Sequence, residues 1–196
     1  LIKFYTNKMK QKKNDVLEKD LVLVGAGHSN IEVLRSLGKK PISGVRVTLI
    51  TNKLEAIYSG MVPGYIEGQY NWSDIVIDLI KMSYEYDFRI IYSSVLKINS
   101  NENKVYLKER SSIKFDFLSI NIGIKSKSIL DKRYDRFFLS LKPVSGIKFL
   151  VEKTLSEKKS NQNNTLVLIG AGAAGVEVAL AFRKRFNKLS LKNRII

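Results

Sequence analysis

Two short glycine-rich turns are the segments of this sequence with the clearest capacity for chemistry. The first lies in LVLVGAGHSN, from Leu21 to Asn30, and the second in LVLIGAGAAGVEVALAF, from Leu166 to Phe182. In a strand–turn–helix unit of the pattern GxGxxG, the first glycine permits a tight bend and the second lets the backbone approach a pyrophosphate. The third lets the helix and the strand pack closely. Free N–H groups at the helix N-terminus attract the phosphates, so both turns predict nucleotide binding.

The second turn carries all three glycines of this pattern. Gly170, Gly172 and Gly175 follow the apolar run TLVLI and precede VEVALAF, which has the spacing of a helix. A strand before the glycines and a helix after them are the context that the fingerprint needs. Nucleotide binding is the preferred interpretation, with packing alone as the alternative.

The first turn keeps both glycines that approach a ligand and departs from the pattern at the third. Gly25 and Gly27 hold the first two positions, and Asn30 replaces only the packing glycine. The acidic residue that usually contacts the ribose is also missing, because Thr51 and Asn52 stand at the end of the next apolar run. A hydroxyl or an amide still hydrogen-bonds a ribose. For this motif taken alone, a plain strand-to-helix turn is the alternative.

The length and composition are those of an ordinary globular chain. Its 196 residues suffice for one substantial core, or for one domain and part of another. Hydrophobic residues make up 44% and charged residues 27%. The formal net charge of +16 suggests nucleic acid or an anionic membrane surface as a partner. The basic residues are scattered, however, which favours a generally basic surface over a dedicated nucleic-acid site.

Absent residue types exclude several kinds of chemistry. The sequence has no Cys, so it contains no disulfide, no thiolate metal site and no CxxC redox pair. The sole histidine, His28, cannot form a multi-histidine metal site. No stretch approaches the roughly 18 uninterrupted apolar residues of a membrane span, and the N-terminus lacks the apolar core of a signal peptide. The default location is therefore cytoplasmic.

Alternating apolar runs and helical patterns predict an α/β fold with a parallel sheet. The first glycine turn, its helix and an apolar strand at 45–50 form one βαβ unit. Further strands are expected at 88–92, 94–98, 104–109 and 115–123, with a β-meander at about 88–120. The other expected segments are a Gly- and Pro-rich loop at 58–72, a helix at 73–86 capped by Ser73, a helix within 141–159 that Pro143 or its neighbours start, and a polar linker at 160–164.

Six segments in a fixed order resemble one known family: LVLVGAGHSNIEVLR, VRVTLI, YSGMVPG, FDFLSINIG, KPVSG and LVLIGAGAAGVEVALA. They are similar to the two-dinucleotide-binding flavoproteins of the pyridine nucleotide-disulfide oxidoreductase superfamily. Within it the chain most resembles the type II NADH dehydrogenase-like branch, which includes the flavoprotein domain fused to selenide, water dikinase. The resemblance covers nearly the whole chain from residue 21 onward.

The resemblance implies a Rossmann-like FAD/NAD(P)-binding fold with a parallel sheet and a β-meander crossover, followed by the start of a second Rossmann-like domain. The expected divisions are a basic, flexible extension at 1–20, a first FAD-binding segment at 21–142, a connecting helix and linker at 143–164, and the start of an NAD(P)H-binding domain at 165–196. KNRII would enter the next strand of that unfinished domain. The chain alone is therefore expected to bind FAD weakly or not at all and to be inactive.

The resemblance also assigns residues to the two cofactors. The segment INIG stands where relatives carry ATG at a second FAD-contacting strand end, so that Asn121 replaces an alanine. The residues expected at FAD are Gly25, Gly27, His28, Ser29, Asn30, Thr51, Ser59, Gly60, Met61, Pro63, Asn121 and Gly123. Those expected at NAD(P)H are Gly170, Gly172 and Gly175, with Glu177 as a candidate near the nicotinamide–flavin stack or, alternatively, a solvated helix residue.

The implied activity is hydride transfer from NAD(P)H to FAD, followed by electron delivery to an acceptor such as a quinone. The cofactors carry this chemistry, which fits a sequence without a Ser–His–Asp set or a metal cluster. The lack of Cys argues against the thiol-dependent disulfide reductases and sulfide:quinone reductases of the superfamily. Two alternatives stay open: an accessory domain linked to selenide, water dikinase without turnover, and a basic nucleic-acid module, which the two glycine turns oppose. Peripheral contact with the inner face of a membrane is a further option for the whole protein.

Overall fold

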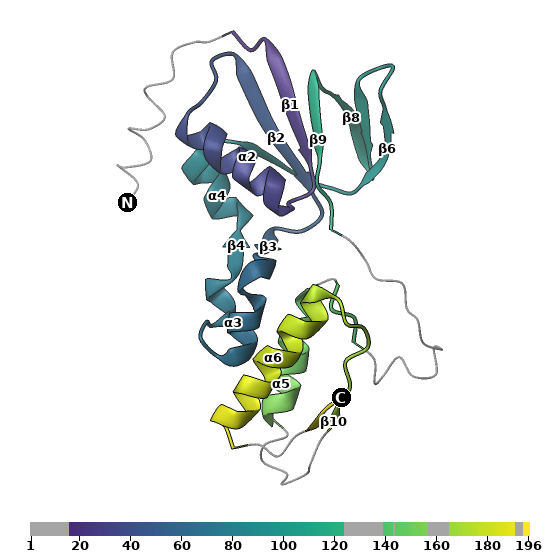
Figure 1. Ribbon diagram of the computed structural model, residues 1–196. Coiled ribbons are helices and arrows are strands. Elements are labelled where there is room, and N and C mark those ends of the chain that lie inside the picture. Colours follow the sequence, from purple (N-terminus) through teal and green to yellow (C-terminus); the bar gives the residue numbers. More distant parts are fainter. Residues whose placement is uncertain (1–15, 124–138, 143, 157–164, 191–193) are drawn as a thin grey trace. The chain divides into compact units, whose positions relative to one another are not determined.

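The computed structural model describes residues 16–123, 139–142, 144–156, 165–190 and 194–196 (Figure 1). These residues form two compact units. The first contains residues 16–54 together with 78–123, and the second contains 55–77 together with the described residues after 138. Most of the expected N-terminal extension, Pro143 and the expected linker at 160–164 lie outside the described residues. The linear sequence did not predict that 55–77 would pack with the C-terminal part.

The first unit is built on a four-stranded, all-parallel sheet in the order β5-β2-β1-β9. Its strands are β1 (Lys19–Val24), β2 (Val45–Thr51), β5 (Arg89–Tyr92) and β9 (Phe117–Ile120). Helix α2 (His28–Lys39) connects β1 to β2, and helix α4 (Leu79–Tyr86) precedes β5. The predicted α/β class, βαβ unit and parallel sheet are confirmed.

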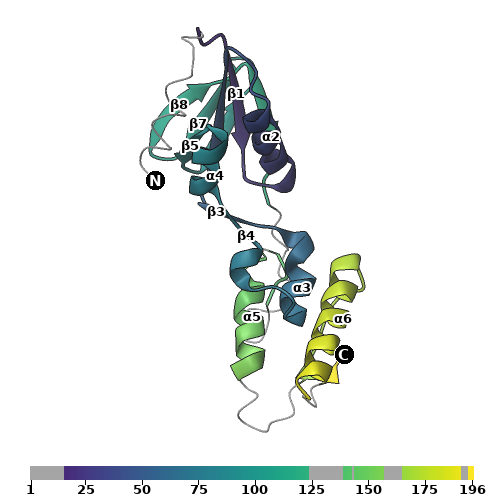
Figure 2. The ribbon, with the colours of Figure 1, turned by 90° about the vertical axis from the view of Figure 1, so that its left-hand side faces the viewer.

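A three-stranded antiparallel meander connects β5 to β9 and covers one face of the sheet. It consists of β6 (Val95–Asn99), β7 (Lys104–Leu107) and β8 (Arg110–Lys114). Val22 of β1 and Ile50 of β2 are buried in one cluster with Val105 of the meander. Figure 2 shows β1 between this meander and α2. The predicted meander is confirmed, although its polar third strand was not anticipated as a separate strand.

Helices cover the opposite face of the sheet. Side chains alternate between the two faces of a strand, so Leu23 and Leu49 point away from the meander. Both are fully buried, as is Leu34 on α2. Helices α2 and α4 contact each other, and a Cβ on Gly38 would collide with Tyr86. The first unit therefore has the helix–sheet–meander layering that the resemblance implies.

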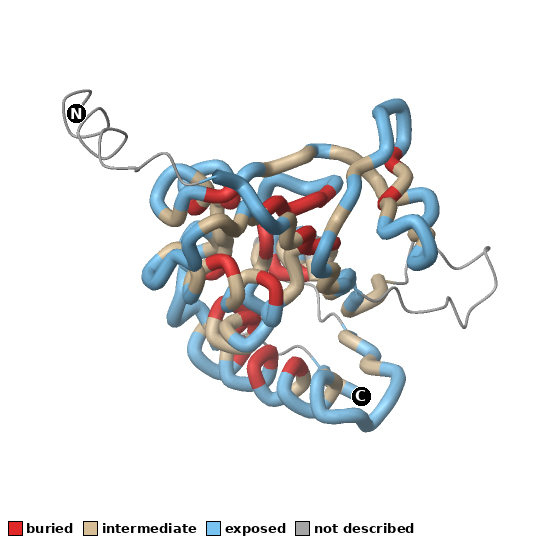
Figure 3. The backbone as a smooth tube through the Cα atoms, turned by 90° about the horizontal axis from the view of Figure 1, so that it is seen from above, coloured by how far each residue is buried: buried red, intermediate tan, exposed pale blue. Residues whose placement is uncertain are grey.

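The second unit is held together by one hydrophobic cluster that joins three helices. Its elements are β3 (Glu55–Ile57), the 3-10 turns η1 (Ser59–Met61) and η2 (Trp72–Asp74), α3 (Val62–Glu67), the paired part of β4 (Val76–Asp78), α5 (Ser145–Ser156), β10 (Thr165–Leu166), α6 (Ala173–Lys188) and β11 (Arg194–Ile195). Ile66 of α3, Ile147 of α5 and Phe182 of α6 are almost fully buried in that cluster. Buried and exposed positions alternate along the helices, as the red and blue segments of Figure 3 show.

The prediction of a loop at 58–72 is wrong for most of its length. Pro63 lies in the first turn of α3, where its missing N–H is no loss. Gly68 ends that helix in the left-handed conformation, at φ +79°. The proline and glycine that suggested a loop are thus the start and end signals of a short helix.

The helix predicted at 73–86 begins only at Leu79, so Ser73 is not its cap. Asp78 caps it instead, because its carboxylate accepts hydrogen bonds from the N–H groups of Ile80 and Lys81, both at 3.0 Å. Asp and Ser are about equally good caps, so local sequence does not separate them. The pairing of β4 with β3, a strand distant in the sequence, decides where the helix begins.

Acid is expected to weaken the join between β1 and β9 through Asp116. Its carboxylate accepts the backbone N–H of Asp20 at 2.8 Å and the ammonium of Lys19 at 3.0 Å. The backbone bond first, and then Lys19, hold the pKa of Asp116 below its ordinary value of 3.8. A pKa that is lower in the folded state means that this stabilisation is present above 3.8 and is lost as the pH falls through the folded value.

The midpoint of urea unfolding, measured at about pH 6 and about pH 3, tests this expectation. Wild type should lose more stability between the two pH values than Asp116→Asn, because the variant has no carboxylate to protonate. Equal losses would show that the Asp116 carboxylate does not contribute to acid sensitivity.

Candidate functional site

The first glycine turn lies directly between β1 and α2, as the fingerprint requires. Gly25 adopts φ +85°, a left-handed conformation that favours glycine and makes the tight bend. Gly27 is the N-cap of α2 in an extended conformation, and it has no side chain with which to cap the helix. A Cβ on either glycine would collide with Asn121 at the end of β9. The turn therefore lies tightly against the neighbouring strand.

The turn sits at the topological switch point of the sheet. From β1 the chain proceeds to β2 and β5 on one side, while β9 is added on the other side of β1. In open α/β sheets, ligands bind in the crevice at the carboxyl ends of the strands where the order reverses. Gly25 follows the carboxyl end of β1 and Asn121 follows that of β9, so both border this crevice.

Asn30 is fully buried behind the turn. Its side-chain amide donates to the carbonyl oxygens of Val24 at 3.1 Å and Gly25 at 2.8 Å. Its side-chain oxygen accepts the hydroxyl of Ser119, on β9, at 2.7 Å. The residue that replaces the third glycine therefore ties the turn, β1 and β9 together, and both of its amide hydrogens are already used within the protein.

Asn121 bonds the turn with both its backbone and its side chain. Its N–H donates to the carbonyl of Val24 at 2.8 Å, and its own carbonyl accepts the N–H of Gly27 at 3.0 Å. Its side-chain oxygen accepts the N–H of Ser29, in the first turn of α2, at 3.1 Å. Ser119 and Asn121, two polar residues at the end of an apolar strand, were the sequence signal for this arrangement, but only Asn121 was singled out.

The remaining predicted residues of the first unit have different surroundings. Thr51 is buried, and its hydroxyl donates to the carbonyl of Lys53 at 3.0 Å and accepts the N–H of Lys53 at 3.2 Å. The Thr51 side chain thus stabilises the turn that follows β2. His28 and Gly123 are exposed, and no heavy atom lies within 4 Å of a Cβ built on Gly123.

The second glycine turn precedes α6 and is open. Gly172 is the N-cap of α6 with no side-chain cap, and within the described part of the chain no heavy atom lies within 4 Å of a Cβ built on it. A Cβ on Gly175 would lie 2.6 Å from the carbonyl oxygen of Gly170, so the third glycine serves close packing as expected. A strand was predicted at 165–169, but β10 contains only Thr165 and Leu166. These are the two residues that pair with β11. That pairing confirms that the last residues enter a strand.

The segment expected beside the flavin belongs to the second unit. Ser59 and Gly60 are exposed in η1, whereas Met61 packs against the hydrophobic cluster and Pro63 starts α3. Glu177 is exposed on α6. The structure thus divides the predicted residues between the two units, with one glycine turn in each.

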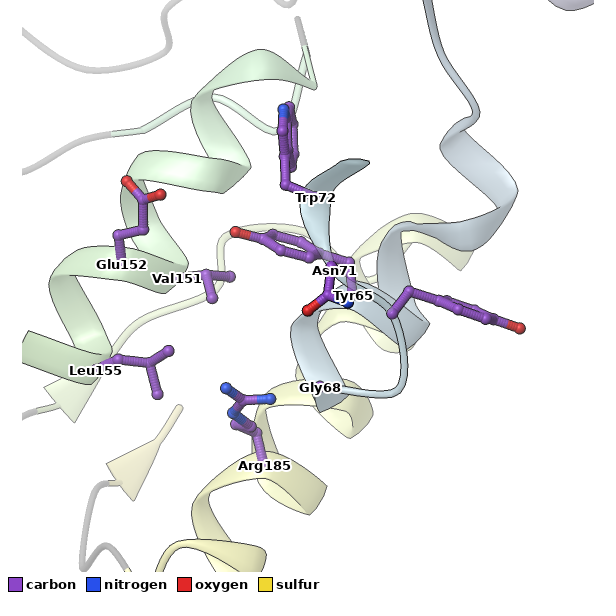
Figure 4. Close-up of a pocket in the computed structure, with 9 residues that line it drawn as sticks. Tyr65, Gly68, Asn71, Trp72, Val151, Glu152, Leu155 and Arg185 are labelled. Carbon is purple, nitrogen blue, oxygen red and sulfur yellow. The ribbon is translucent and has the colours of Figure 1, made fainter. Parts of the chain in front are cut away.

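A cavity of about 330 Å³ lies elsewhere in the second unit (Figure 4). Arg185 of α6 extends between α5 and Gly68, on which a Cβ would collide with the guanidinium. Among the described residues, the buried Nε of Arg185 has no hydrogen-bond partner. Burial raises the pKa of Tyr65 in this cavity, and Glu152 raises it further while Arg185 opposes them.

The cavity is separate from the second glycine turn. Arg185 lies about 18 Å along α6 from Ala173, given the rise of an α-helix. The cavity therefore does not form part of the predicted nicotinamide site. Sequence reasoning missed it because RKRFNK has the pattern of a solvated basic helix face.

The described part of the chain contains neither a candidate metal centre nor a helix that could span a membrane. Within the described ranges, no group of three His, Asp or Glu residues could hold a metal ion. None of the described helices has the length and apolar character needed to cross a bilayer.

Comparisons of sequence place this arrangement among known proteins. A profile of the family described as pyridine nucleotide-disulphide oxidoreductase matches residues 19–193. The NADH dehydrogenase-like protein YutJ of Bacillus subtilis (strain 168) is 25% identical over 180 residues, which cover 88% of this chain and 47% of that protein. The chain thus spans about half the length of this curated relative.

Solved structures share the fold. The sulfide:quinone oxidoreductase of the hyperthermophilic bacterium Aquifex aeolicus superposes with a TM-score of 0.71 at 17% identity, covering 91% of this chain and 42% of that one. NDH2 of Plasmodium falciparum, in complex with RYL-552, also gives a TM-score of 0.71, at 16% identity over 88% of this chain and 38% of that one. The α/β architecture is therefore that of these oxidoreductases.

Proposed function

Because the chain belongs to the pyridine nucleotide-disulphide oxidoreductase family, we propose that the protein is a flavoprotein that oxidises NAD(P)H and passes the electrons to an acceptor such as a quinone. FAD and NAD(P)H are the cofactors of this family, and when bound they supply the hydride transfer itself. One observation carries the proposal: a single chain holds two strand–glycine turn–helix units, the first at the switch point of a parallel sheet.

The first turn fits the pyrophosphate of FAD. Gly27 presents no Cβ at the N-terminus of α2, and the first turn of that helix supplies N–H donors and partial positive charge. The one side chain that bonds these donors from outside the helix, among the described contacts, is that of Asn121. We assign the pyrophosphate to Gly25, Gly27, His28 and Ser29, and give Asn30 the role of holding the turn in place.

The other assignments follow the order of the sequence motifs. Thr51, whose hydroxyl already bonds Lys53, and Gly123 would border the FAD site through their backbones, and Ser59, Gly60, Met61 and Pro63 would lie beside the flavin. The open turn of Gly170, Gly172 and Gly175 would hold the phosphates of NAD(P)H, since a backbone without a Cβ allows close approach there. Glu177 would lie near the stacked rings.

The acceptor is a separate part of the proposal. Similarity to a NADH dehydrogenase-like protein supports an NADH-oxidising role, and the names of the solved neighbours include a quinone oxidoreductase. A net charge of +16 would suit peripheral contact with an anionic membrane, where quinones reside. The alternative, an accessory domain linked to selenide, water dikinase, predicts bound flavin without turnover.

Reduction of the flavin by NADH tests the proposed activity. It also tests the assignment of FAD to the first turn and of NAD(P)H to the second. The full-length protein containing this chain should purify with flavin absorbance that NADH bleaches under anaerobic conditions and that a soluble quinone restores. A Gly172→Ala variant should keep its flavin and its stability, because the added methyl meets no atom of the residues that the structure describes. It should need at least about tenfold more NADH for the same bleaching, since the methyl blocks approach of the phosphates.

Dithionite serves as the control reductant, since it should bleach the flavin of wild type and variant alike. A full-length protein that purifies without flavin and binds none would contradict the proposal. Bleaching by NADH that no acceptor reverses would favour the accessory role. If Gly172→Ala and wild type are bleached by the same NADH concentration, NAD(P)H does not bind at the second turn.

A further inference from the structure

We propose that the Asn121 side chain is a built-in substitute for the FAD pyrophosphate: it caps α2 when the cofactor is absent and must give up the Ser29 N–H when the cofactor binds. This inference rests on the assignment of FAD to the first turn. It concerns the departure from the family pattern at this position, where an asparagine stands in place of the usual alanine.

Helix α2 lacks a cap of its own. An N-cap side chain normally accepts a hydrogen bond from the second or third N–H of its helix. Gly27 occupies the N-cap and has no side chain, so this bond is missing from the helix sequence. The oxygen of the Asn121 side chain accepts from Ser29, the second residue of the helix, at 3.1 Å. Asn121, the residue that follows β9, thus supplies the cap that the glycine fingerprint removes.

The backbone of Asn121 is fixed, whereas its side chain can turn. Its N–H bonds Val24 and its carbonyl accepts from Gly27, which anchors the residue between β1 and the turn. Only a side-chain rotation can release Ser29 without breaking these bonds. The residue is partly exposed, so room for such a rotation exists on the solvent side.

The second glycine turn provides an internal comparison. There, Gly172 also caps its helix without a side chain, but none of the described residues has an atom within 4 Å of a Cβ built on it. In the first turn, the side chain and the carbonyl of Asn121 would both collide with a Cβ on Gly27. Of the two turns, only the first is therefore filled by a neighbouring polar group.

Phosphate and carboxamide oxygens are alternative acceptors for the same donor. An N–H of the first helical turn that bonds Asn121 cannot make a linear bond to a pyrophosphate oxygen at the same time. When FAD binds, a pyrophosphate oxygen therefore replaces the side-chain oxygen of Asn121 as the acceptor of the Ser29 N–H. The apo protein is stabilised by the bond, and the cofactor affinity is lowered by the same interaction.

Two substitutions with opposite expected effects test the exchange in the full-length protein. Asn121→Ala removes the competing acceptor, so the Kd for FAD should fall about three- to tenfold while the melting temperature of the flavin-free protein drops by a few degrees. Asn121→Asp places a carboxylate at the positive end of α2, so the flavin-free protein should melt no lower than wild type. Its Kd for FAD should rise at least about tenfold, because the carboxylate repels the phosphates.

Asn101→Ala, a change at an exposed turn residue of the meander, is the control and should alter neither quantity. Weaker FAD binding in both the Ala and the Asp variant would overturn the inference, because Asn121 would then be a direct ligand of the cofactor. An unchanged Kd in Asn121→Ala would overturn it as well.

Amide hydrogen exchange at Ser29 separates this inference from the proposed function. In the flavin-free protein, the Ser29 N–H should exchange more slowly in wild type than in Asn121→Ala. Equal exchange overturns the cap even if wild type binds FAD. If wild type binds no FAD at all, the assignment of the first turn fails, and the exchange of acceptors fails with it.

Discussion

A Gly27→Ala variant is expected to lose most of its flavin binding. A Cβ at this position would collide with the side chain of Asn121 and lie 2.7 Å from the backbone carbonyl oxygen of Asn121. The side chain can rotate away, but the carbonyl is held by the hydrogen bonds of Asn121 with Val24 and Gly27. The turn itself must therefore move. Gly27 has φ −73° and ψ 168°, which alanine adopts freely, so the effect is steric.

Displacing the turn also displaces the N–H groups that face the phosphates. Each charge-assisted hydrogen bond that is lost costs about 1.5–3 kcal/mol, which is roughly a ten- to hundredfold increase in Kd. Titration of flavin-free protein with FAD, followed by flavin fluorescence, measures this change. Gly172→Ala, the same substitution at the matching position of the open turn, is the control and should bind FAD as wild type does. Wild-type affinity in Gly27→Ala would contradict the placement of FAD at the first turn.

An Asn30→Gly variant is expected to be destabilised by about 2–4 kcal/mol, although it restores the third glycine of the fingerprint. The change removes three hydrogen bonds, two to the carbonyls of Val24 and Gly25 and one from the hydroxyl of Ser119. Asn30 is fully buried, so these groups lose their partner away from water and a small void remains. A glycine inside the first turns of α2 adds conformational entropy to the unfolded chain.

Urea unfolding of the flavin-free protein measures this effect without involving the cofactor. Glu32→Ala is the control on the same helix, since Glu32 is exposed and pairs only with neighbours on α2. It should unfold close to wild type. If Asn30→Gly is as stable as wild type, the buried network does not hold the turn, and the asparagine is merely tolerated at the packing position.

Much of the fold was predictable because its signals are local. The runs of β1, β2 and β5 are apolar and contain β-branched residues, and Gly25 between β1 and α2 can adopt the left-handed conformation that this turn needs and that other residues disfavour. The predictions failed where two local readings were equally good. Pro63 and Gly68 fit a loop as well as a short helix, and Ser73 and Asp78 are equally good caps. Packing against α6 and pairing with β3 decided these cases.

In the candidate site, too, some features were predictable from local sequence and others depended on tertiary contacts. Both glycine turns were predicted from residue type and spacing, and the strand end with Asn121 was predicted from the resemblance to the family. The bonds that Asn30 makes with Ser119, and that Asn121 makes with Ser29, join residues about ninety positions apart, so no local pattern contains them. The cavity at Arg185 was missed for a related reason, since its walls come from three helices that are far apart in the sequence.

The sequence by itself determined the α/β class, the family and the two glycine turns, because backbone freedom at a glycine and the period of apolar residues are encoded by neighbouring residues. Only the tertiary structure decided what the departures from the fingerprint do. Parallel pairing of β1 with β9 brings Ser119 to Asn30 and Asn121 to the start of α2. A buried amide must find its hydrogen-bond partners wherever the fold provides them, and here the neighbouring strand provides them.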